Sequence, residues 1–260
     1  MGFASLGSGS RGNGTVIALA GRLFLVDCGF TLKQTEARLQ RLGLAGGDLD
    51  GIFVTHEHAD HINGVRALAH KYAIPVYGSW GTLKKGLEGV VTHTFDGDDE
   101  FEVEGVNVTS VRVPHDAKEP TQYIFGADGV RVGVLSDLGC VTHHVMNQFS
   151  QCTHLLLEAN HDRQMLQRGS YPPRLKRRVG EDLGHLSNEQ AWSLLKQIAH
   201  PEMQVVIGHI SEQNNHLDIL QRLFEPLRGG LSGLGYATQQ EGFAWIGYKP
   251  IQRQASLGAL

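Results

Sequence analysis

Short apolar runs bounded by glycine or polar residues recur along the chain and predict a β-rich protein. Runs on either side of Gly21 form one expected hairpin, and Asp128-Gly129 joins two other runs in a strong hairpin signal. Apolar and polar residues also alternate on both sides of Glu104-Gly105, as in two adjacent strands. The predicted strands span residues 15–20, 22–27, 51–55, 74–77, 101–113 (two strands), 123–125, 130–135, 154–158 and 203–208.

Apolar residues at helical spacing occupy several of the segments between these strands. One such segment ends at Gly43, a typical C-cap, and Ser187 with Gln190 forms a capping box that opens another helix. The predicted helices span residues 31–42, 62–72, 187–199 and 217–227. Neither a linker nor a repeat divides the pattern. We therefore expect one domain over residues 1–251, with two packed sheets flanked by helices, and a flexible tail over residues 252–260.

The composition is that of a soluble globular enzyme. The 260 residues, 41% hydrophobic and 19% charged, are enough to bury a full core. The absence of a bilayer-length apolar run and of a signal peptide predicts a cytoplasmic location. Cys28, Cys140 and Cys152 are widely spaced, which predicts buried thiols rather than disulfides. The net charge of −4 excludes a broad nucleic-acid-coating surface but allows a local basic patch.

Four potential metal ligands lie within six residues, directly after the apolar run at 51–55. They follow the pattern His-x-His-x-Asp-His and are His56, His58, Asp60 and His61. Imidazole and carboxylate groups suit zinc, manganese or iron. A histidine pair alone also occurs by chance on exposed turns, but the six-residue pattern is far more specific. Placed at the end of a strand, these side chains can serve two ions.

Two ions need further ligands, and three other apolar strands also end in a suitable side chain. These side chains are His115, Asp137 and His209. Taken singly, each has an alternative interpretation as a strand-end residue that faces water. Together with the six-residue pattern they make a set of seven candidate ligands, which chance explains poorly. His93 is a weaker competitor of His115 for the same position.

On these residues the chain resembles the metallo-β-lactamase fold superfamily, whose signature is the His-x-His-x-Asp-His motif. It is most similar to the YycJ/WalJ-like branch of metallo-hydrolases. The matching segments are residues 8–13, 27–29, 114–120, 136–139, 158–162, 184–189 and 208–215. The resemblance implies a four-layer αββα sandwich with a metal site at the edge of the two sheets.

The resemblance also implies how the ligands are shared between two divalent ions. His56, His58 and His115 would hold one ion; Asp60, His61 and His209 would hold the other; and Asp137 would bridge them. Lactamases carry a cysteine at the position of Asp137, so this departure counts against β-lactam hydrolysis. Zinc and manganese use the same ligand types, with iron as a further option, so the sequence does not select the ion.

Two such cations a few ångströms apart can hold a hydroxide between them and clamp the attacked and leaving oxygens. The reaction class is then hydrolysis, and residues around the metals must select the substrate. His185 precedes a helix N-terminus and Glu158 ends a strand; both resemble a histidine–glutamate pair of the tRNA-processing nuclease RNase Z. With Asp60, they are the predicted catalytic residues. A helix-capping histidine and a strand-end glutamate are the alternative interpretation.

A basic segment between Glu158 and His185 is a candidate track for a nucleic-acid backbone. It includes Arg174, Arg177 and Arg178, with Tyr171 nearby. A solvated charged surface is an equally common explanation of such a segment.

The glycine-rich run Gly7–Gly12 matches a dinucleotide-binding pattern, but no long strand is predicted before it and a strand follows, so no nucleotide cofactor is expected. Ser8 or Asn13 in this loop would contact the substrate or a ligand loop. Asp116 and Glu119 would orient imidazoles, or would simply form an exposed acidic loop.

The main hypothesis is a dinuclear metal-dependent phosphodiesterase, most simply a nuclease similar to DNA exonucleases, with nucleic acid as substrate and no membrane partner. A thioesterase or lactonase of the glyoxalase II type is one alternative. A metal-stabilised regulatory module without turnover is another. The oligomeric state stays open, although homodimers are common in this fold.

Overall fold

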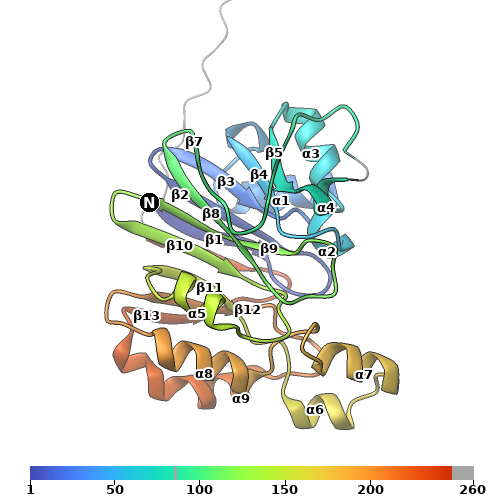
Figure 1. Cartoon of the computed structure of the whole chain (residues 1–260), viewed down its shortest axis with the longest axis vertical. Helices are drawn as coiled ribbons and strands as arrows, with labels where there is room; N and C mark the ends of the chain where they lie inside the picture. Colours follow the sequence, from blue (N-terminus) through green and yellow to red (C-terminus); the bar gives the residue numbers. More distant parts are fainter. Residues whose placement is uncertain (85–86, 248–260) are drawn as a thin grey trace, which may run out of the picture.

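The computed structural model describes residues 1–84 and 87–247. Within these residues the strands form two seven-stranded sheets, which pack face to face with helices on their outer surfaces (Figure 1). The predicted αββα sandwich is therefore confirmed. The predicted domain end at 251 and the tail 252–260 lie outside the described residues.

The first sheet is mixed and contains the strand that precedes the histidine motif. Its strands, in spatial order, are β14 (Phe243–Gly247), β1 (Gly2–Gly7), β2 (Gly14–Leu19), β3 (Arg22–Val26), β4 (Gly51–Val54), β5 (Val76–Ser79) and β6 (Thr92–Phe95). The strands from β3 to β6 run parallel, so their carboxyl ends share one edge.

The second sheet repeats this plan with antiparallel strands on one side and parallel strands on the other. Its strands, in spatial order, are β13 (Gly233–Tyr236), β12 (Gln204–Gly208), β11 (His154–Glu158), β10 (Val130–Leu135), β9 (Thr121–Ala127), β8 (Val106–Arg112) and β7 (Glu100–Val103). The strands from β10 to β13 are parallel. The carboxyl ends of β10, β11 and β12 therefore also share an edge.

Helices cover the outer faces of both sheets and connect them to the site. On the first sheet they are α1 (Leu32–Arg41), α2 (Ala59–Ile62), α3 (Val65–Tyr72) and α4 (Trp80–Leu83), with the 3-10 turn η1 (Gly46–Asp48). On the second they are α5 (His143–Phe149), α8 (Asn188–Ile198) and α9 (Leu217–Phe224), with η2 (Glu225–Gly230). The short helices α6 (Arg163–Arg168) and α7 (Pro173–Gly180) project beside the second sheet (Figure 1).

The layering follows from the two-residue period of the strands. In β3, Leu25 packs with the helix layer that contains Leu39, whereas Phe24 points to the other sheet. There the ring of Phe24 stacks on Phe125, with centroids 5.6 Å apart. Burial on both faces explains why these strands are near-continuous apolar runs.

Most predicted elements are confirmed, including both predicted hairpins and the capping box at Ser187. The predicted helix 62–72 is divided into α2 and α3, and the predicted helix 217–227 ends at Phe224, where η2 follows. The predicted strand at 74–77 lies two residues later, as β5. Other elements were not predicted: β1, β6, β13, β14 and α4 to α7.

The prediction that no long strand precedes the glycine-rich run Gly7–Gly12 is wrong, because β1 precedes it. All six residues of β1 are buried, so the strand shows no alternation. The strand β2 follows the loop, so the run still lacks the helix that a dinucleotide-binding loop requires.

In the described part of the chain, Cys28 and Cys152 are buried free thiols, and Cys140 is half-buried. Among the helices of these residues, none has the length and apolar character needed to span a membrane.

Candidate metal centre

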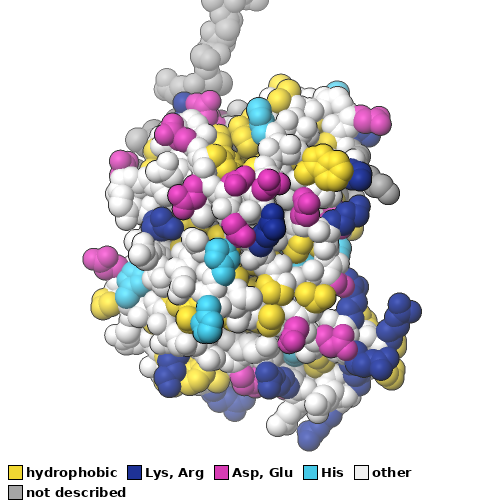
Figure 2. Space-filling view, in the orientation of Figure 1, with side chains coloured by type: hydrophobic (Ala, Val, Ile, Leu, Met, Phe, Trp, Pro, Cys, Tyr) yellow, Lys and Arg dark blue, Asp and Glu magenta, His cyan; other side chains and the backbone are white. Residues whose placement is uncertain are grey.

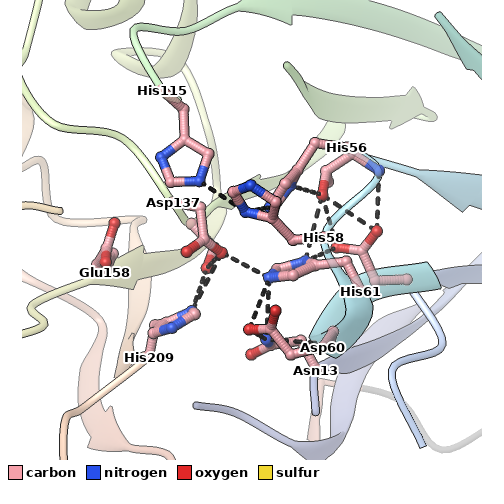
Figure 3. A network of polar contacts seen from close by, with 12 residues as sticks. Asn13, His56, His58, Asp60, His61, His115, Asp137, Glu158 and His209 are labelled. Carbon is pink, nitrogen blue, oxygen red and sulfur yellow. Dashed lines mark hydrogen bonds and ion pairs between the residues drawn. The ribbon is translucent and has the colours of Figure 1, made fainter. Parts of the chain in front are cut away.

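The histidine motif begins where β4 ends and continues into α2. His56 and His61 are buried, and the backbone between them turns so that their rings lie 4.1 Å apart. His58 Nδ1 lies 3.0 Å from His56 Nε2 and 3.3 Å from His115 Nε2 (Figure 3). Three imidazole nitrogens from two segments thus converge on one point.

The second sheet supplies the opposite side of the cluster. Asp137 follows β10, Glu158 ends β11 and His209 follows β12, all at the shared carboxyl edge. The Oδ2 atom of Asp137 lies 2.8 Å from His61 Nε2 and 3.1 Å from His209 Nδ1 (Figure 3). Asp137 therefore links the strand ends of both sheets, and the structure brings the predicted ligands together.

Two residues of this cluster have left-handed backbone conformations. The φ angles of Asp137 and His209 are 56° and 47°. Such values are uncommon for residues other than glycine and each cost roughly 1–3 kcal/mol. Because the surrounding sheets enforce this geometry, both side chains turn inward immediately after their strands.

Hydrogen bonds fix the orientation of the histidine rings. His115 Nδ1 lies 3.0 Å from the carbonyl oxygen of Gly184 and so donates to it, which leaves Nε2 directed at His58. Ser136 Oγ contacts His209 Nδ1 at 3.0 Å. Such partners set the tautomer of a metal-binding histidine.

The buried charges of the cluster balance one another. Burial acts to raise the pKa of Asp137, but the nearby His209 and His61 imidazoles hold this pKa well below its usual value. Burial, aided by His61, lowers the pKa of His56 far enough to keep its ring neutral at pH 7. Burial also opposes the charged form of His61, yet Asp137 and Asp27 raise its pKa well above normal.

The donor atoms fall into groups that could each hold a metal ion. These groups are His56, His58 and His115; His56, His61 and Asp137; and Asp137, Glu158, His185 and His209. Imidazoles beside a buried carboxylate fit divalent transition ions by chemistry and by spacing. Asp60, 3.4 Å from His61 Nε2, lies next to the second group.

His185 and Glu158 form a contact at the border of the cluster. His185 Nδ1 lies 2.7 Å from Glu158 Oε1 and 3.1 Å from Asp137 Oδ1. Glu158 is fully buried, and its Oε2 accepts a hydrogen bond from the Leu138 amide. Burial lowers the pKa of His185, but Glu158 and Asp137 outweigh this effect and raise the pKa well above normal. The two carboxylates thus favour the protonated form of His185.

A cavity of about 370 Å³ opens over the cluster. His58, Asp60, Asp137, His185 and His209 line its inner part. Residues of the α6–α7 region, Tyr171, Leu175, Arg178 and Val179, line the facing wall. A substrate can therefore reach the cluster through this cavity, which lies between α7 and the loops that carry the candidate ligands.

The predicted basic residues lie at different places around this cavity. Arg178 lines it and forms an ion pair with Asp116, which also lines it. Arg177 lines a neighbouring cavity, and Arg174 is exposed on α7. Asp116 Oδ1 lies 3.5 Å from His115 Nε2, the nitrogen that faces the cluster, so Gly184 and not Asp116 sets the orientation of this ring. Glu119 instead accepts a hydrogen bond from the Gly81 amide and, within the described residues, has no hydrogen bond to an imidazole, so its predicted role is wrong.

Ser8 and Asn13 contact ligand loops instead of lining the cavity. Ser8 Oγ accepts a hydrogen bond of 2.8 Å from the His209 amide. Asn13 Nδ2 lies 3.0 Å from His61 Nε2 and 3.3 Å from Asp60 Oδ2. Both residues are buried, and Ser10 is the loop residue that lines the cavity. The geometry therefore favours the ligand-loop alternative for both.

Several residues of the site were missed from the sequence. Asp27 and Ser136 support ligands, and Ser10 and Leu175 line the cavity, as does Tyr171, which the sequence indicated with the basic segment. The signals for Asp27 and Ser136 were their place beside strand ends and their position in the matching segments 27–29 and 136–139. His93, the competitor of His115, lies outside the cluster on β6, where its ring stacks on Tyr77.

A four-layer αββα sandwich with a histidine–aspartate cluster at the shared strand-end edge defines the metallo-β-lactamase class of proteins. A family model described as "Beta-lactamase superfamily domain" matches residues 22–210. The chain therefore belongs to the metallo-β-lactamase superfamily, and its clusters are typical of the dinuclear metal site of that fold.

Similar proteins were found by sequence and by structure. The chain is 33% identical over 222 residues to "Exodeoxyribonuclease WalJ" of Streptococcus pneumoniae serotype 2 (strain D39 / NCTC 7466), covering 82% of each. It is 34% identical over 220 residues to "Exodeoxyribonuclease YycJ" of Bacillus anthracis, covering 82% of this chain and 83% of that one. A shorter match, 40% identical over 83 residues, covers 30% of this chain and 32% of "Hydroxyacylglutathione hydrolase" of Yersinia pestis (strain Pestoides F).

Among solved structures, the metallo-beta-lactamase fold protein YhfI from Bacillus subtilis superimposes with a TM-score of 0.69 at 17% identity. The match covers 95% of this chain and 99% of YhfI. At this identity the likeness supports the fold and not the activity.

Proposed function

We propose that this protein is a metal-dependent phosphodiesterase that degrades DNA from an end. The observation that carries the proposal is the similarity to two exodeoxyribonucleases over 82% of this chain, together with the converging histidine–aspartate cluster. The family comprises several reaction types, so the metal cluster alone does not select DNA.

We further propose two divalent ions, zinc or manganese, in this cluster. His56, His58 and His115 would hold one ion, Asp60, His61 and His209 the other, and Asp137 would bridge both; these residues provide the required donors within one cluster. Two such ions supply Lewis acidity and a nucleophile at neutral pH. Asn13 and Ser8 would hold the Asp60–His61 turn and the His209 loop in place.

His185 is proposed to act on the substrate at the edge of the cluster. Its Nδ1 atom faces Glu158 and Asp137, which leaves Nε2 on the other side of a ring that lines the cavity. A raised pKa keeps a proton available there, first for a hydrogen bond to a phosphate oxygen and then for transfer to the departing sugar oxygen. Glu158 would act as a positioning residue that maintains this charge.

The side of the cavity formed by α7 is proposed to contact the DNA backbone. Arg178 lines the cavity, and the exposed Arg174 adds positive charge to the same helix, whereas Arg177 lies on the other face of α7. The Arg178 guanidinium is already paired with Asp116, so a phosphate would compete with that carboxylate for it. Tyr171, which lines the cavity, offers a ring face to a base.

The test is hydrolysis of end-labelled single- and double-stranded oligonucleotides by protein loaded with Zn²⁺ or Mn²⁺. We expect mononucleotide release that is abolished in His56→Ala and reduced at least about a hundredfold in His185→Ala. The matched control is His93→Ala, because His93 is an exposed histidine on β6 away from the cluster. Absence of cleavage by metal-loaded wild type would overturn the proposal.

A thioesterase is the second candidate, favoured by the shorter match to a hydroxyacylglutathione hydrolase. It predicts turnover of acyl-glutathione thioesters that survives in His185→Ala, because a thiolate leaves without the proton that an alkoxide needs. Metal binding without turnover of either substrate would instead indicate a regulatory module. A homodimer and a cytoplasmic location remain predictions.

A further inference from the structure

A second cavity, of about 510 Å³, lies on the face of α7 opposite to the metal centre. Leu175, Arg178 and Val179 line the metal cavity, whereas Lys176, Arg177 and Gly180 line the second one. With 3.6 residues per turn, these two sets occupy opposite sides of the helix. Figure 2 shows lysine and arginine side chains gathered over this α6–α7 part of the surface.

Cationic side chains from both short helices surround the second cavity. Arg163 begins α6, and Lys176 and Arg177 belong to α7. Lys176 Nζ donates to the Gln167 carbonyl oxygen at 2.6 Å, and Arg163 Nε donates to Ser187 Oγ at 3.2 Å. Among the described residues, the Arg177 guanidinium has no hydrogen-bond or ion-pair partner.

Acidic residues reduce this positive charge only in part. Glu181 and Asp182 also line the cavity, but both are exposed. Arg163 has a weak partner outside the cavity lining, Glu189, at 3.7 Å. Among the residues that line the cavity, the three cations outnumber the two acids, and Gln167 and Gln190 add neutral polar groups. An anion of modest size fits this arrangement.

His161 adds a buried polar side chain to the lining of this cavity. It lines the same cavity, is only 2% exposed, and its buried Nδ1 has no hydrogen-bond partner among the described residues. Burial, with help from His185 and Arg163, lowers its pKa to about 4, so the ring is neutral at pH 7. A buried polar nitrogen without a partner is rare in folded proteins. Because Nδ1 is shielded from solvent, Nε2 is the ring nitrogen that would donate a hydrogen bond to a phosphate oxygen in the cavity.

We propose that this second cavity is a phosphate-binding site formed by Arg163, Lys176, Arg177 and His161. If the bound phosphate belongs to a DNA strand, the inference rests on the proposed function. A helix is about 10–12 Å across, so a DNA strand of a few nucleotides reaches from the metal cavity over α7 to this site. The same site accepts a free phosphate group, such as that of a released nucleotide.

The first test follows chemical protection of Lys176 and needs no turnover. Wild-type protein is treated with an amine-acetylating reagent, with and without inorganic phosphate or a short oligonucleotide, and modification is quantified by mass spectrometry. We expect either ligand to slow acetylation of Lys176 severalfold and to leave the exposed Lys33 of α1 unchanged. Protection should be lost in Arg177→Gln. Equal acetylation of Lys176 with and without both ligands would overturn the proposal.

The second test separates strand phosphates from free phosphate. If the site holds the strand, Arg177→Gln raises KM for long oligonucleotides about fivefold, lowers the salt dependence of binding by about one ion and leaves kcat unchanged. Arg168→Gln is the control, because Arg168 is an exposed arginine of α6 that lines neither cavity. Protection of Lys176 by phosphate with unchanged KM assigns the site to free phosphate. Absent DNA cleavage with intact protection rejects only the proposed function.

Discussion

The carboxylate of Asp27 lies 2.8 Å from Nδ1 of His61, on the side of the ring that faces away from Asp137. Thr55 Oγ1 donates to the same carboxylate at 2.9 Å, and the Thr55 amide donates to its other oxygen at 2.8 Å. Asp27 therefore connects the end of β3 to the ligand motif after β4. It determines which nitrogen of His61 is directed into the cluster.

Replacing Asp27 by Asn should lower metal affinity and activity together, by about 10- to 100-fold, because the amide favours a different His61 orientation. Metal content by mass spectrometry and kcat/KM are the measurements. Asp128→Asn is a matched control, since both aspartates have a left-handed φ, 62° and 49°, that asparagine tolerates. Full metal occupancy in Asp27→Asn would contradict this role.

Replacing Glu158 by Gln should reduce kcat on DNA by at least about tenfold and leave metal content unchanged. The reason is that Gln keeps a partner for the Leu138 amide but no longer stabilises the charged His185 ring. Exposed Glu202→Gln serves as the control. Loss of metal in Glu158→Gln would show that Glu158 is a ligand and not a positioning residue.

Replacing Gly29 by Ala should displace the ligand motif. A Cβ atom at Gly29 would lie 1.8 Å from the carbonyl oxygen of Asp60 and 2.9 Å from the Asn13 amide nitrogen, so backbone must move. We expect a loss of about 3–5 kcal/mol in the free energy of unfolding, measured in urea, and reduced metal content. At Gly230 a Cβ meets nothing within 4 Å, so Gly230→Ala should unfold as the wild type does.

His161 should make the folded state sensitive to acid. Its pKa falls from 6.5 in the unfolded chain to about 4 in the fold, so the unfolded chain binds more protons between these pH values. Its contribution to stability is therefore complete above about pH 6.5 and declines toward pH 4. Between pH 7 and pH 4.5, the free energy of unfolding measured in urea should fall by about 2–3 kcal/mol less in His161→Gln than in the wild type. The exposed His143→Gln should match the wild type.

The sequence predicts the metal cluster well because each member has a local signal. His115, Asp137 and His209 all follow runs of apolar residues, and such runs end at one edge when strands are parallel. These residues can therefore be recognised without knowing how distant parts of the chain pack. What the sequence does not show is which nitrogen of each ring faces the cluster, since that depends on partners such as Asp27 and Gly184.

The wall opposite the cluster could not be predicted for a different physical reason. None of the residues of α7 is buried, so the helix has no apolar stripe to reveal its period. From the sequence, its basic residues are expected to form one positive patch. The structure instead distributes Arg177 and Arg178 to separate cavities. Strand β1 was not predicted because both of its faces are buried, so polar and apolar residues do not alternate along it.

The pairing of β1 with β14 has a consequence for biosynthesis. Gly2 pairs with Gly247, so one side of β1 remains an open hydrogen-bonding edge until nearly all described residues have left the ribosome. The first sheet is thus completed by a contact between residues that are far apart in the sequence, and pairings of this kind generally slow folding and leave an edge open to aggregation in the meantime. Chaperone dependence during translation should accordingly concentrate on this early strand.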